Sequence, residues 1–284
     1  MLAIGGMLFA LLTQPSFATT AASPAAARHD PQIRSSAVLI VDEADSSVLL
    51  ARNADVAVPI ASITKLMTSL VVLEAGLPLD EPLKMTREDT TIANGGPSRL
   101  PPGAVLTRGE LLHLALMSSE NHAAHALGRT YPGGTKAILE AMNLKAKVLG
   151  MKRTHFTDTT GLSMGNIASP QDLARLVIVT SKNPVIREYS TDDSETVMVG
   201  RYPVEFRTTN TLTRKDDWDI IVQKTGYTQA AGRCLVMKAL IENRPVVMVL
   251  LNSFGKYTRV ADAARVRRWI EAGLPATALA RSGK

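Results

Sequence analysis

The chain has 284 residues, of which 45% are hydrophobic and 20% charged, a balance that allows a folded core and argues against disorder throughout. Lysine and arginine outnumber aspartate and glutamate by 32 to 26, but aromatic residues make up only 4% and the basic residues are scattered, so the composition does not favour nucleic-acid binding. The single cysteine, Cys234, cannot form an intramolecular disulfide and lies in an apolar stretch, which favours a small buried side chain over a nucleophile.

The N-terminal residues predict an export signal. Residues 2–12 are almost entirely apolar, a run too short to cross a bilayer as a stable helix. Ser16-Phe17-Ala18 then places small residues where a signal peptidase cleaves. We therefore expect a signal peptide over residues 1–18, or to about residue 28 with a flexible start, and a periplasmic mature protein. No Lys or Arg precedes the apolar run, so a short uncleaved anchor is the alternative.

The first predicted elements form a hairpin followed by a helix. Residues 36–42 and 47–51 have strand composition, and the acidic, polar residues between them predict a turn. Residues 61–75 show leucines on one side at helical spacing, which predicts a helix. Residues 78–102 are rich in Pro, Gly and polar residues, and we expect a long excursion across the surface there.

The middle of the chain is predicted to be helical. Thr107 and Glu110 have the spacing of a capping box and open one helix. Ser169 ahead of Pro170 is typical of another helix start. The predicted helices span residues 107–117, 119–129, 135–149 and 170–182.

The last third returns to strands and closes with a helix over residues 257–272, where apolar residues recur at helical spacing. Residues 242–245 predict the turn between the last two strands. The predicted strands span residues 196–199, 204–208, 219–224, 233–241 and 246–251. This order favours an α/β (α+β) fold, in which an antiparallel sheet is built from both chain ends and a helical region is inserted. We expect one folded unit over residues 33–276.

The first motif with catalytic chemistry is Ser62-Ile63-Thr64-Lys65. On a helix, residues three apart share a face, so Lys65 can reach the Ser62 hydroxyl and take its proton. The helix start also offers free backbone N–H groups to an oxyanion. The pattern alone is weak, because it recurs at Ser253-Phe254-Gly255-Lys256, where Gly255 and a strand end argue against a helix.

The second motif is Ser119-Glu120-Asn121. Ser119 can relay a proton between nucleophile and leaving group, and Asn121 can hold a substrate carbonyl or orient a lysine. This pattern also recurs, at Ser181-Lys182-Asn183. The structural alternative is that Ser119 is a helix N-cap.

The third motif, Lys224-Thr225-Gly226, occurs once, at the end of a predicted strand. Lys224 and Thr225 can bind a substrate carboxylate. Gly226 lets a ligand backbone lie close against the strand, as in strand addition. The alternative is a strand followed by a glycine turn.

The three motifs, in this order and on these elements, resemble the set found in class A β-lactamases and penicillin-binding proteins. The likeness extends through residues 61–68, 114–121, 160–163 and 254–257. Within this set, the sequence resembles the serine-type D-Ala-D-Ala peptidases, which are the low-molecular-mass penicillin-binding proteins. The likeness is greatest to the D-alanyl-D-alanine endopeptidases of the penicillin-binding protein seven type. It covers roughly residues 33–276 and implies a β-lactamase/transpeptidase-like fold.

The resemblance assigns a role to each motif residue. It implies that Ser62 is the acylated nucleophile, that Lys65 is its base, and that Ser119 and Asn121 complete the proton network. It implies that Lys224, with Thr225 and Gly226, binds substrate. It places the oxyanion hole at the backbone N–H groups of Ser62 and Tyr227, each such donor typically being worth about 3 kcal/mol.

The implied activity is a serine DD-endopeptidase that opens D-alanyl cross-links between peptidoglycan stems. DD-carboxypeptidase activity is the alternative. The residues after Gly226 are used by two strands and a helix, which leaves no room for the second β-rich domain and anchor of the carboxypeptidase relatives. We therefore expect the shorter endopeptidase type, with membrane contact at most peripheral through the basic closing helix.

A β-lactamase is the less favoured enzyme. Class A enzymes deacylate with a glutamate in a Glu-x-x-Leu-Asn loop, and the nearest string here, residues 140–143, lies inside a predicted helix. We therefore expect β-lactam antibiotics to be covalent inhibitors that leave a long-lived adduct on Ser62. A non-catalytic peptidoglycan-binding module would need a broken motif set, and all three motifs are intact.

No metal or other cofactor is expected. His122 and His125 are three apart on a predicted helix and His113 lies one helix earlier, but no acidic ligand is arranged with them and His-Glu-x-x-His is absent. The favoured interpretation is a partly exposed helical face.

Overall fold

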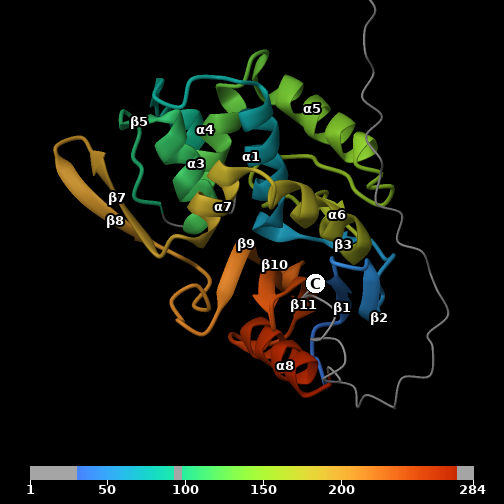
Figure 1. The fold of residues 1–284 in the computed structure, drawn as a ribbon. Coiled ribbons are helices and arrows are strands. Elements are labelled where there is room, and N and C mark those ends of the chain that lie inside the picture. Colours follow the sequence, from blue (N-terminus) through green and yellow to red (C-terminus); the bar gives the residue numbers. More distant parts are fainter. Residues whose placement is uncertain (1–30, 93–97, 274–284) are drawn as a thin grey trace, which may run out of the picture.

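The computed structural model describes residues 31–92 and 98–273. The predicted signal peptide, residues 1–18, lies outside the described residues. Within them, the protein forms a central sheet, a helical region on one face of that sheet and a single long helix on the other (Figure 1).

The central sheet joins the two ends of the chain. Its five strands follow the order β2-β1-β11-β10-β9, and every neighbouring pair is antiparallel. The N-terminal hairpin therefore lies beside the C-terminal meander, and the predicted antiparallel sheet made from both chain ends is confirmed. Its strands are β1 (Ala37–Asp42), β2 (Ser47–Arg52), β9 (Asp219–Thr228), β10 (Gly232–Ile241) and β11 (Arg244–Ser253).

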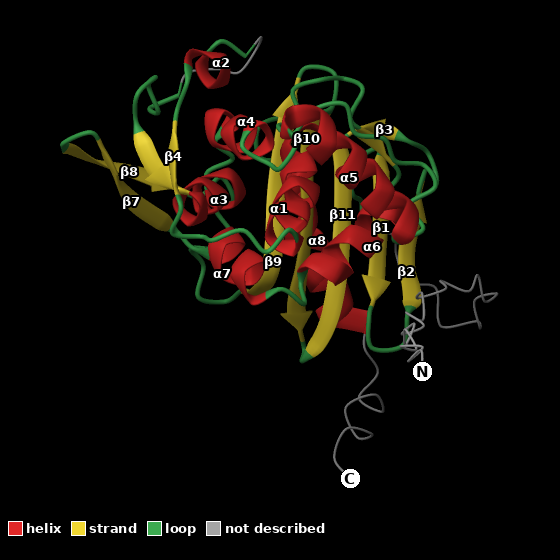
Figure 2. Cartoon of the chain, turned by 90° about the horizontal axis from the view of Figure 1, so that it is seen from above, coloured by secondary structure: helices red, strands yellow, loops and turns green. Residues whose placement is uncertain are grey.

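Both faces of the sheet are covered, which is why β1 is buried at every residue. Along β1, Leu39 and Val41 pack into the core shared with the helical region, whereas Val38 and Ile40 pack against the opposite layer. Figure 1 shows α1 (Thr64–Glu74) and α6 (Pro170–Thr180) on one side of the sheet and α8 (Thr258–Gly273) on the other, and Figure 2 shows the helical region overlying the strands. The strands therefore read as continuous apolar runs rather than alternating ones.

The inserted region is helical, as expected. The capping box predicted at its start is present, because Thr107 and Glu110 exchange side-chain and backbone hydrogen bonds. The side chain of Ser169 caps α6 by accepting from the N–H of Asp172, with Pro170 at the first turn. Its main helices are α3 (Arg108–Met117), α4 (Asn121–Arg129), α5 (Gly134–Val148) and α7 (Pro184–Thr191).

Several short elements were not predicted, because strands of two or three residues and a helix of four show too little sequence pattern to be recognised. The expected surface excursion over residues 78–102 contains structure: β4 (Pro82–Lys84) pairs with β5 (Val105–Thr107), and α2 (Arg87–Thr90) follows β4. The helix α7 was also missed. A second short pair joins β3 (Val58–Pro59) to β6 (Ile167–Ala168) and links the segment just before Ser62 to the inserted region.

The hairpin of β7 (Ser194–Val199) and β8 (Tyr202–Arg207) extends away from the body of the molecule (Figure 1). The hairpin between β10 and β11 turns over two residues rather than the four predicted. Glu242 and Asn243 have φ of 50° and 60°, which suits a tight two-residue turn, so Arg244 and Pro245 already belong to β11.

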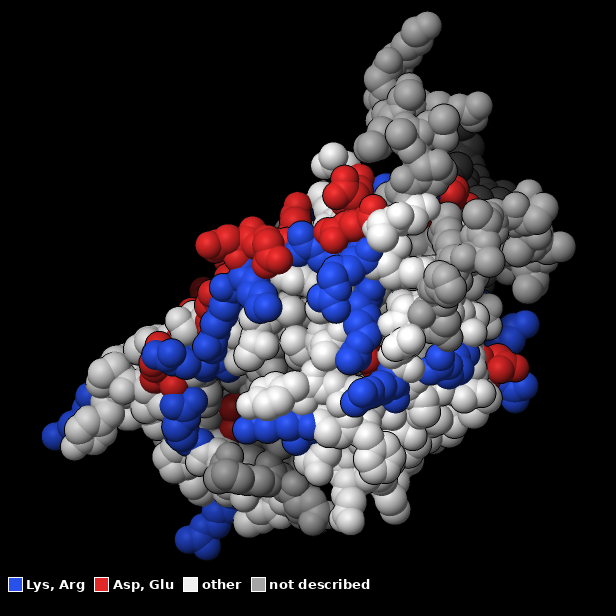
Figure 3. Space-filling view, turned by 90° about the horizontal axis from the view of Figure 1, so that it is seen from below, with Lys and Arg blue, Asp and Glu red and all other residues white. Residues whose placement is uncertain are grey.

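Two of the basic residues of α8 pair with neighbouring carboxylates. Arg265 pairs with Asp262 at 2.7 Å, and Arg267 pairs with Glu271 at 2.6 Å. On the face seen in Figure 3, Lys and Arg side chains spread between uncharged areas, and acidic side chains gather toward one margin. Among residues 31–92 and 98–273, no helix has the length and apolar character needed to cross a bilayer.

Candidate active site

The turn that carries Ser62 is a short 3-10 helix, η1 (Ala61–Ile63), which runs directly into α1. Ala61 has φ of 48°, in the left-handed region that disfavours a side chain, so the backbone is strained one residue before Ser62. Lys65 lies one turn later on the same face and is 0% exposed. Its Nζ is 2.9 Å from the Ser62 Oγ, within hydrogen-bond distance, as the spacing of the motif predicts.

Lys65 has two further partners that fix its orientation. Its Nζ donates to the Asn121 Oδ1 at 2.7 Å and to the backbone carbonyl of Thr160 at 2.7 Å. A neutral amine has two N–H groups and one lone pair. If those two carbonyl oxygens take both N–H groups, the lone pair is left facing the Ser62 hydroxyl.

The protonation of Lys65 is set by opposing influences. Burial is the largest influence and lowers the pKa of Lys65 to about 7, while the negative charges of Glu120 and Asp158 act in the opposite direction. An amine with a pKa near 7 is substantially unprotonated at neutral pH. Lys65 therefore meets the main condition for a general base.

The segment between α3 and α4 brings the second motif to Lys65. Glu120, not Ser119, is the N-cap of α4, because its carboxylate accepts from the N–H of Ala123 at 2.6 Å. The capping alternative for Ser119 is therefore wrong. Ser119 instead has φ of 61°, an unusual backbone conformation for a residue other than glycine. Helix α4 begins two residues later at Asn121, and the Asn121 side-chain amide contacts Lys65.

The third motif lies within β9, not at the end of that strand as predicted. β9 continues to Thr228, because Tyr227 and Thr228 still pair with β10. A Cβ built on Gly226 would lie 3.0 Å from the Ile60 carbonyl oxygen and 3.1 Å from the Ser62 nitrogen. Glycine therefore lets the strand lie directly against the turn that carries Ser62, and the alternative of a plain glycine turn is wrong.

Lys224 is the second buried lysine of the site and is 0% exposed. Burial holds its pKa well below the ordinary value, and the positive charges of Lys65 and Arg259 lower it further. Its Nζ donates to the Thr225 carbonyl at 3.0 Å, and the Thr225 hydroxyl lies 2.5 Å from that of Thr209. A positive charge on Lys65 therefore disfavours a positive charge on Lys224.

The side chain of Tyr227 is 57% exposed, and the Arg233 guanidinium lies over its ring, 4.4 Å from the centroid. Tyr227 occupies the strand position directly after Gly226, which itself packs on the Ser62 turn. The predicted contribution of Tyr227 involves its backbone N–H, so the outward direction of the ring does not conflict with it.

Two further groups join this cluster and were not predicted from the sequence. The Thr160 carbonyl binds Lys65. The likeness to known peptidases includes residues 160–163, but it assigned no role to this backbone atom. Arg259 of α8 is 9% exposed, and within the described part of the chain its Nε and Nη1 have no hydrogen-bond partner. A buried guanidinium with unused donors next to Lys224 is a ready anion site.

The histidines have structural roles. His113 stacks on Tyr189 with ring centroids 4.5 Å apart and lies 3.0 Å from a carboxylate oxygen of Asp192. His125 lies 2.8 Å from the carboxylate of Asp89. The expected partly exposed face is wrong for His113 and His122, each 7% exposed, because neighbouring segments cover them. No cluster of three or more metal-ligating side chains occurs among the residues that the structure describes.

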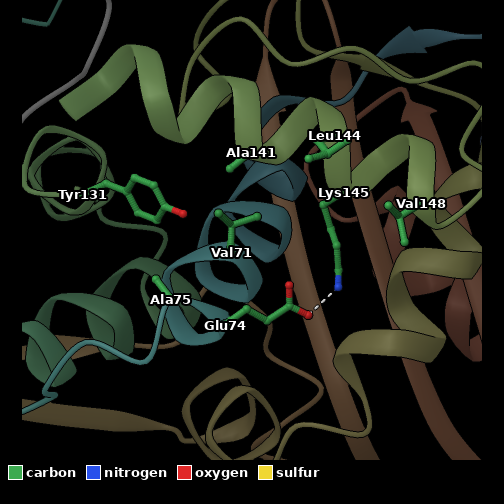
Figure 4. Close-up of a pocket in the computed structure, with 8 residues that line it drawn as sticks. All are labelled: Val71, Glu74, Ala75, Tyr131, Ala141, Leu144, Lys145 and Val148. Atoms are coloured by element: carbon green, nitrogen blue, oxygen red, sulfur yellow. Dashed lines mark hydrogen bonds and ion pairs between the residues drawn. The ribbon is translucent and has the colours of Figure 1, made fainter. Parts of the chain in front are cut away.

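Of two hollows in the surface, one is lined by residues of the second motif and the other is not. One, of about 200 Å³, includes Ser119 and Asn121 in its wall and continues toward Arg99 and Arg207. The other, of about 260 Å³, lies between α1 and α5, where Glu74 and Lys145 pair across it (Figure 4). Its remaining lining is mostly apolar and contains none of the motif residues.

Comparison with known proteins gives one consistent result. Residues 23–255 match the family model described as D-alanyl-D-alanine carboxypeptidase. The chain is 46% identical to a D-alanyl-D-alanine endopeptidase of Escherichia coli, covering 96% of this chain and 89% of that protein. It is also 46% identical to a D-alanyl-D-alanine endopeptidase of Pseudomonas aeruginosa, covering 88% and 82%.

A solved structure agrees with the sequence comparisons. The Streptomyces K15 DD-transpeptidase is 26% identical to this chain and superimposes with a TM-score of 0.79 over 85% of this chain and 98% of that one. The β-lactamase/transpeptidase-like fold expected from the motifs is therefore confirmed.

Proposed function

Because the chain belongs to the D-alanyl-D-alanine carboxypeptidase family of serine peptidases, we propose that it cleaves D-alanyl peptide bonds of peptidoglycan through an acyl-enzyme on Ser62. One observation carries the proposal more than any other. The buried amine of Lys65, with a pKa of about 7, lies 2.9 Å from the Ser62 hydroxyl.

Acylation begins when neutral Lys65 takes the proton of the Ser62 hydroxyl. The oxygen attacks the carbonyl carbon of the D-alanyl bond, and the carbonyl oxygen becomes an oxyanion. Backbone N–H groups of Ser62 and Tyr227 stabilise that oxyanion, each such donor being worth about 3 kcal/mol. The closeness of Gly226 to the Ser62 nitrogen supports this pairing of two separate segments.

Collapse of the intermediate needs a proton on the leaving amine. Ser119 receives this role because it lies beside Asn121, which contacts Lys65 directly. Protonated Lys65 passes its proton through the Ser119 hydroxyl to the nitrogen, and the C–N bond breaks. Water then attacks the ester and restores Ser62, as in other serine hydrolases.

A carboxylate next to the cleaved bond is bound by the third motif. Lys224 and the Thr225 hydroxyl lie on β9, and Arg259 adds a buried guanidinium with two unused donors. Burial and the positive charges of Lys65 and Arg259 lower the pKa of Lys224. A negatively charged carboxylate bound beside these groups would offset that repulsion. A bound carboxylate would therefore favour the charged form of Lys224.

Endopeptidase activity is the preferred form. The relatives at 46% identity are named D-alanyl-D-alanine endopeptidases, whereas an Escherichia coli D-alanyl-D-alanine carboxypeptidase is 28% identical. We propose that the physiological substrate is the D-alanyl cross-link between two stems, met in the periplasm. Carboxypeptidase cleavage of single stems is the second candidate, favoured by the family description.

The test uses purified substrates and identifies products by mass. The protein is incubated with cross-linked muropeptide dimers and, separately, with pentapeptide monomers. Loss of dimers with intact pentapeptides is expected for an endopeptidase. Loss of terminal D-alanine from pentapeptides with intact dimers would instead establish a carboxypeptidase, and no cleavage of either would refute the proposal.

A β-lactam antibiotic should acylate Ser62 and remain bound. The Glu140–Asn143 stretch, nearest in sequence to a deacylating loop, lies within α5, and its Asn143 side chain is occupied by the backbone of Phe156. A slow loss of fluorescent penicillin over hours would support an inhibitor, whereas steady turnover of nitrocefin would support a β-lactamase.

A further inference from the structure

A single carboxylate folds the loop that follows Phe156. Asp158 Oδ1 accepts the backbone N–H groups of Thr160 and Gly161, each at 2.6 Å, and the Thr160 hydroxyl at 2.9 Å. Asp158 Oδ2 accepts the N–H of Ser163 at 2.6 Å. Both oxygens of one side chain are thus used to turn the backbone over residues 160–163.

The residues turned by Asp158 contact both members of the nucleophile–base pair. The Thr160 carbonyl accepts from the Lys65 Nζ at 2.7 Å. Gly161, at φ +86°, lies so close to the nucleophile turn that an added Cβ would be 2.8 Å from the Ser62 nitrogen. Asp158 therefore acts on Lys65 through Thr160 and on the Ser62 turn through Gly161, because the position of its carboxylate fixes both backbone segments.

The same loop has attachments besides those to the Asp158 carboxylate, although the Asn166 amide also contacts Asp158 Oδ1 at 3.4 Å. The Asn166 side chain, 0% exposed, donates to the Thr64 hydroxyl at 3.0 Å and accepts the N–H of Thr157 at 2.7 Å. The Thr159 hydroxyl donates to the Ala124 carbonyl at 3.0 Å. Loss of the Asp158 contacts should therefore shift residues 160–163 without unfolding the whole loop.

We propose that Asp158 is a positioning residue for acylation, which holds the Thr160 carbonyl against Lys65 so that the lone pair of the amine faces the Ser62 hydroxyl. The proposal rests on the function assigned to Ser62 and Lys65 above. Asp158 touches neither the nucleophile nor the substrate in this role, because it acts through the backbone it folds.

The charge of Asp158 provides a second, separable effect. Lys65 is faced by Glu120 at the start of α4, by Asp158 on its loop and by Lys224 on β9, with Arg259 of α8 beyond Lys224. Asp158 and Glu120 both favour protonated Lys65, against the larger effect of burial. Removal of the Asp158 charge therefore lowers the pKa of Lys65 and moves the pH at which acylation sets in to a lower value.

Three variants separate positioning from general damage. Asp158→Asn removes the charge and one acceptor oxygen, whereas Asp158→Glu keeps the charge on a longer side chain. Asp172→Asn is the matched control: Asp172 is 2% exposed and anchors the start of the same loop by accepting the N–H of Arg153 at 2.7 Å and the Thr154 hydroxyl at 3.0 Å. It is not among the charges that influence Lys65.

The measurement is the rate constant for acylation by fluorescent penicillin, for each folded variant from about pH 5 to pH 9. Asp158→Asn should lower the maximal rate about tenfold or more and move the midpoint to lower pH. Asp158→Glu should lower the rate with its midpoint unmoved, and Asp172→Asn should lower the melting temperature with the wild-type profile retained.

An unchanged rate in Asp158→Asn, or a lower rate at every pH with the wild-type midpoint, would overturn the proposal. If Asp158→Asn does not fold, Asp158→Glu decides, because a full wild-type rate in that variant would also overturn it. Failure of the wild-type protein to acylate at any pH would instead refute the function assigned to Ser62, and the two failures are therefore distinguishable.

Discussion

Two segments of this chain share the pattern Ser-x-x-Lys and differ in almost every physical respect. Ser62 lies at a helix start, and the amine of Lys65 is buried 2.9 Å from its hydroxyl. Ser253 ends a strand, and its hydroxyl is 2.6 Å from that of Ser35, while Lys256 is exposed beside Tyr257. The comparison teaches that burial and the contacts supplied by distant segments, rather than the pattern, suit the first lysine to the role of a base.

The largest expected difference between the two segments is at the serine. Ser62→Ala should abolish labelling by fluorescent penicillin, because the hydroxyl proposed to form the ester is removed. Ser253→Ala should label within about twofold of wild type and lose only the stability of one buried hydrogen bond, about 1 kcal/mol. Equal labelling of the two variants would remove the distinction between the segments.

The next difference is at the lysine. Lys65→Ala should slow acylation by about two orders of magnitude or more, because the general base is lost. The exposed Lys256 gives the matched control, and Lys256→Ala should react at the wild-type rate. Stopped-flow labelling measures both, and a Lys65→Ala rate within a few-fold of wild type would assign the base elsewhere.

A third comparison is between two lysines on neighbouring strands of the sheet, Lys224 on β9 and Lys238 on β10. Lys224→Ala should slow acylation by about a hundredfold, through loss of substrate binding at the carboxylate. Lys238 on the adjacent strand pairs with Glu43 and Ser181, so Lys238→Ala should alter stability and leave the acylation rate unchanged. Thermal melts of both variants separate the two effects.

The last effect, that of pH on the wild-type protein, is graded and small near neutral pH. The pKa of Lys65 is lowered to about 7, and the residue acts only when unprotonated. Acylation should therefore be fast above pH 7 and slow by about tenfold for each pH unit below it. A rate that is flat between about pH 5 and 8 would contradict a titrating lysine base.

Much of the fold could be predicted because its long elements have strong local signals. The capping box at Thr107 and the Ser169-Pro170 start marked their helices within two residues. The end of β9 was predicted too early, since Gly226 resembles a turn and only its tertiary contact with the Ser62 turn explains a glycine inside a strand. The short pairs β3–β6 and β4–β5 depend on partners distant in sequence.

The site could be predicted only as far as its side chains form motifs. Ser62, Lys65, Asn121 and Lys224 came from three short patterns, which the fold brings together. The contact of the Thr160 carbonyl with Lys65 could not be predicted, because every residue has a carbonyl. The direction of this one depends on the fold of the loop, which the Asp158 carboxylate holds. Arg259 was hidden among the basic residues of α8, although it is buried and the others are not.

The most direct test of the site is to locate the covalent adduct without altering the protein. Wild-type protein is treated with penicillin, digested, and its modified peptide is identified by mass. The penicilloyl group should be found on the peptide that contains Ser62, with Ser119 and Ser253 unmodified. An adduct on any other residue, or none after prolonged incubation, would contradict the assignment of Ser62 as the nucleophile.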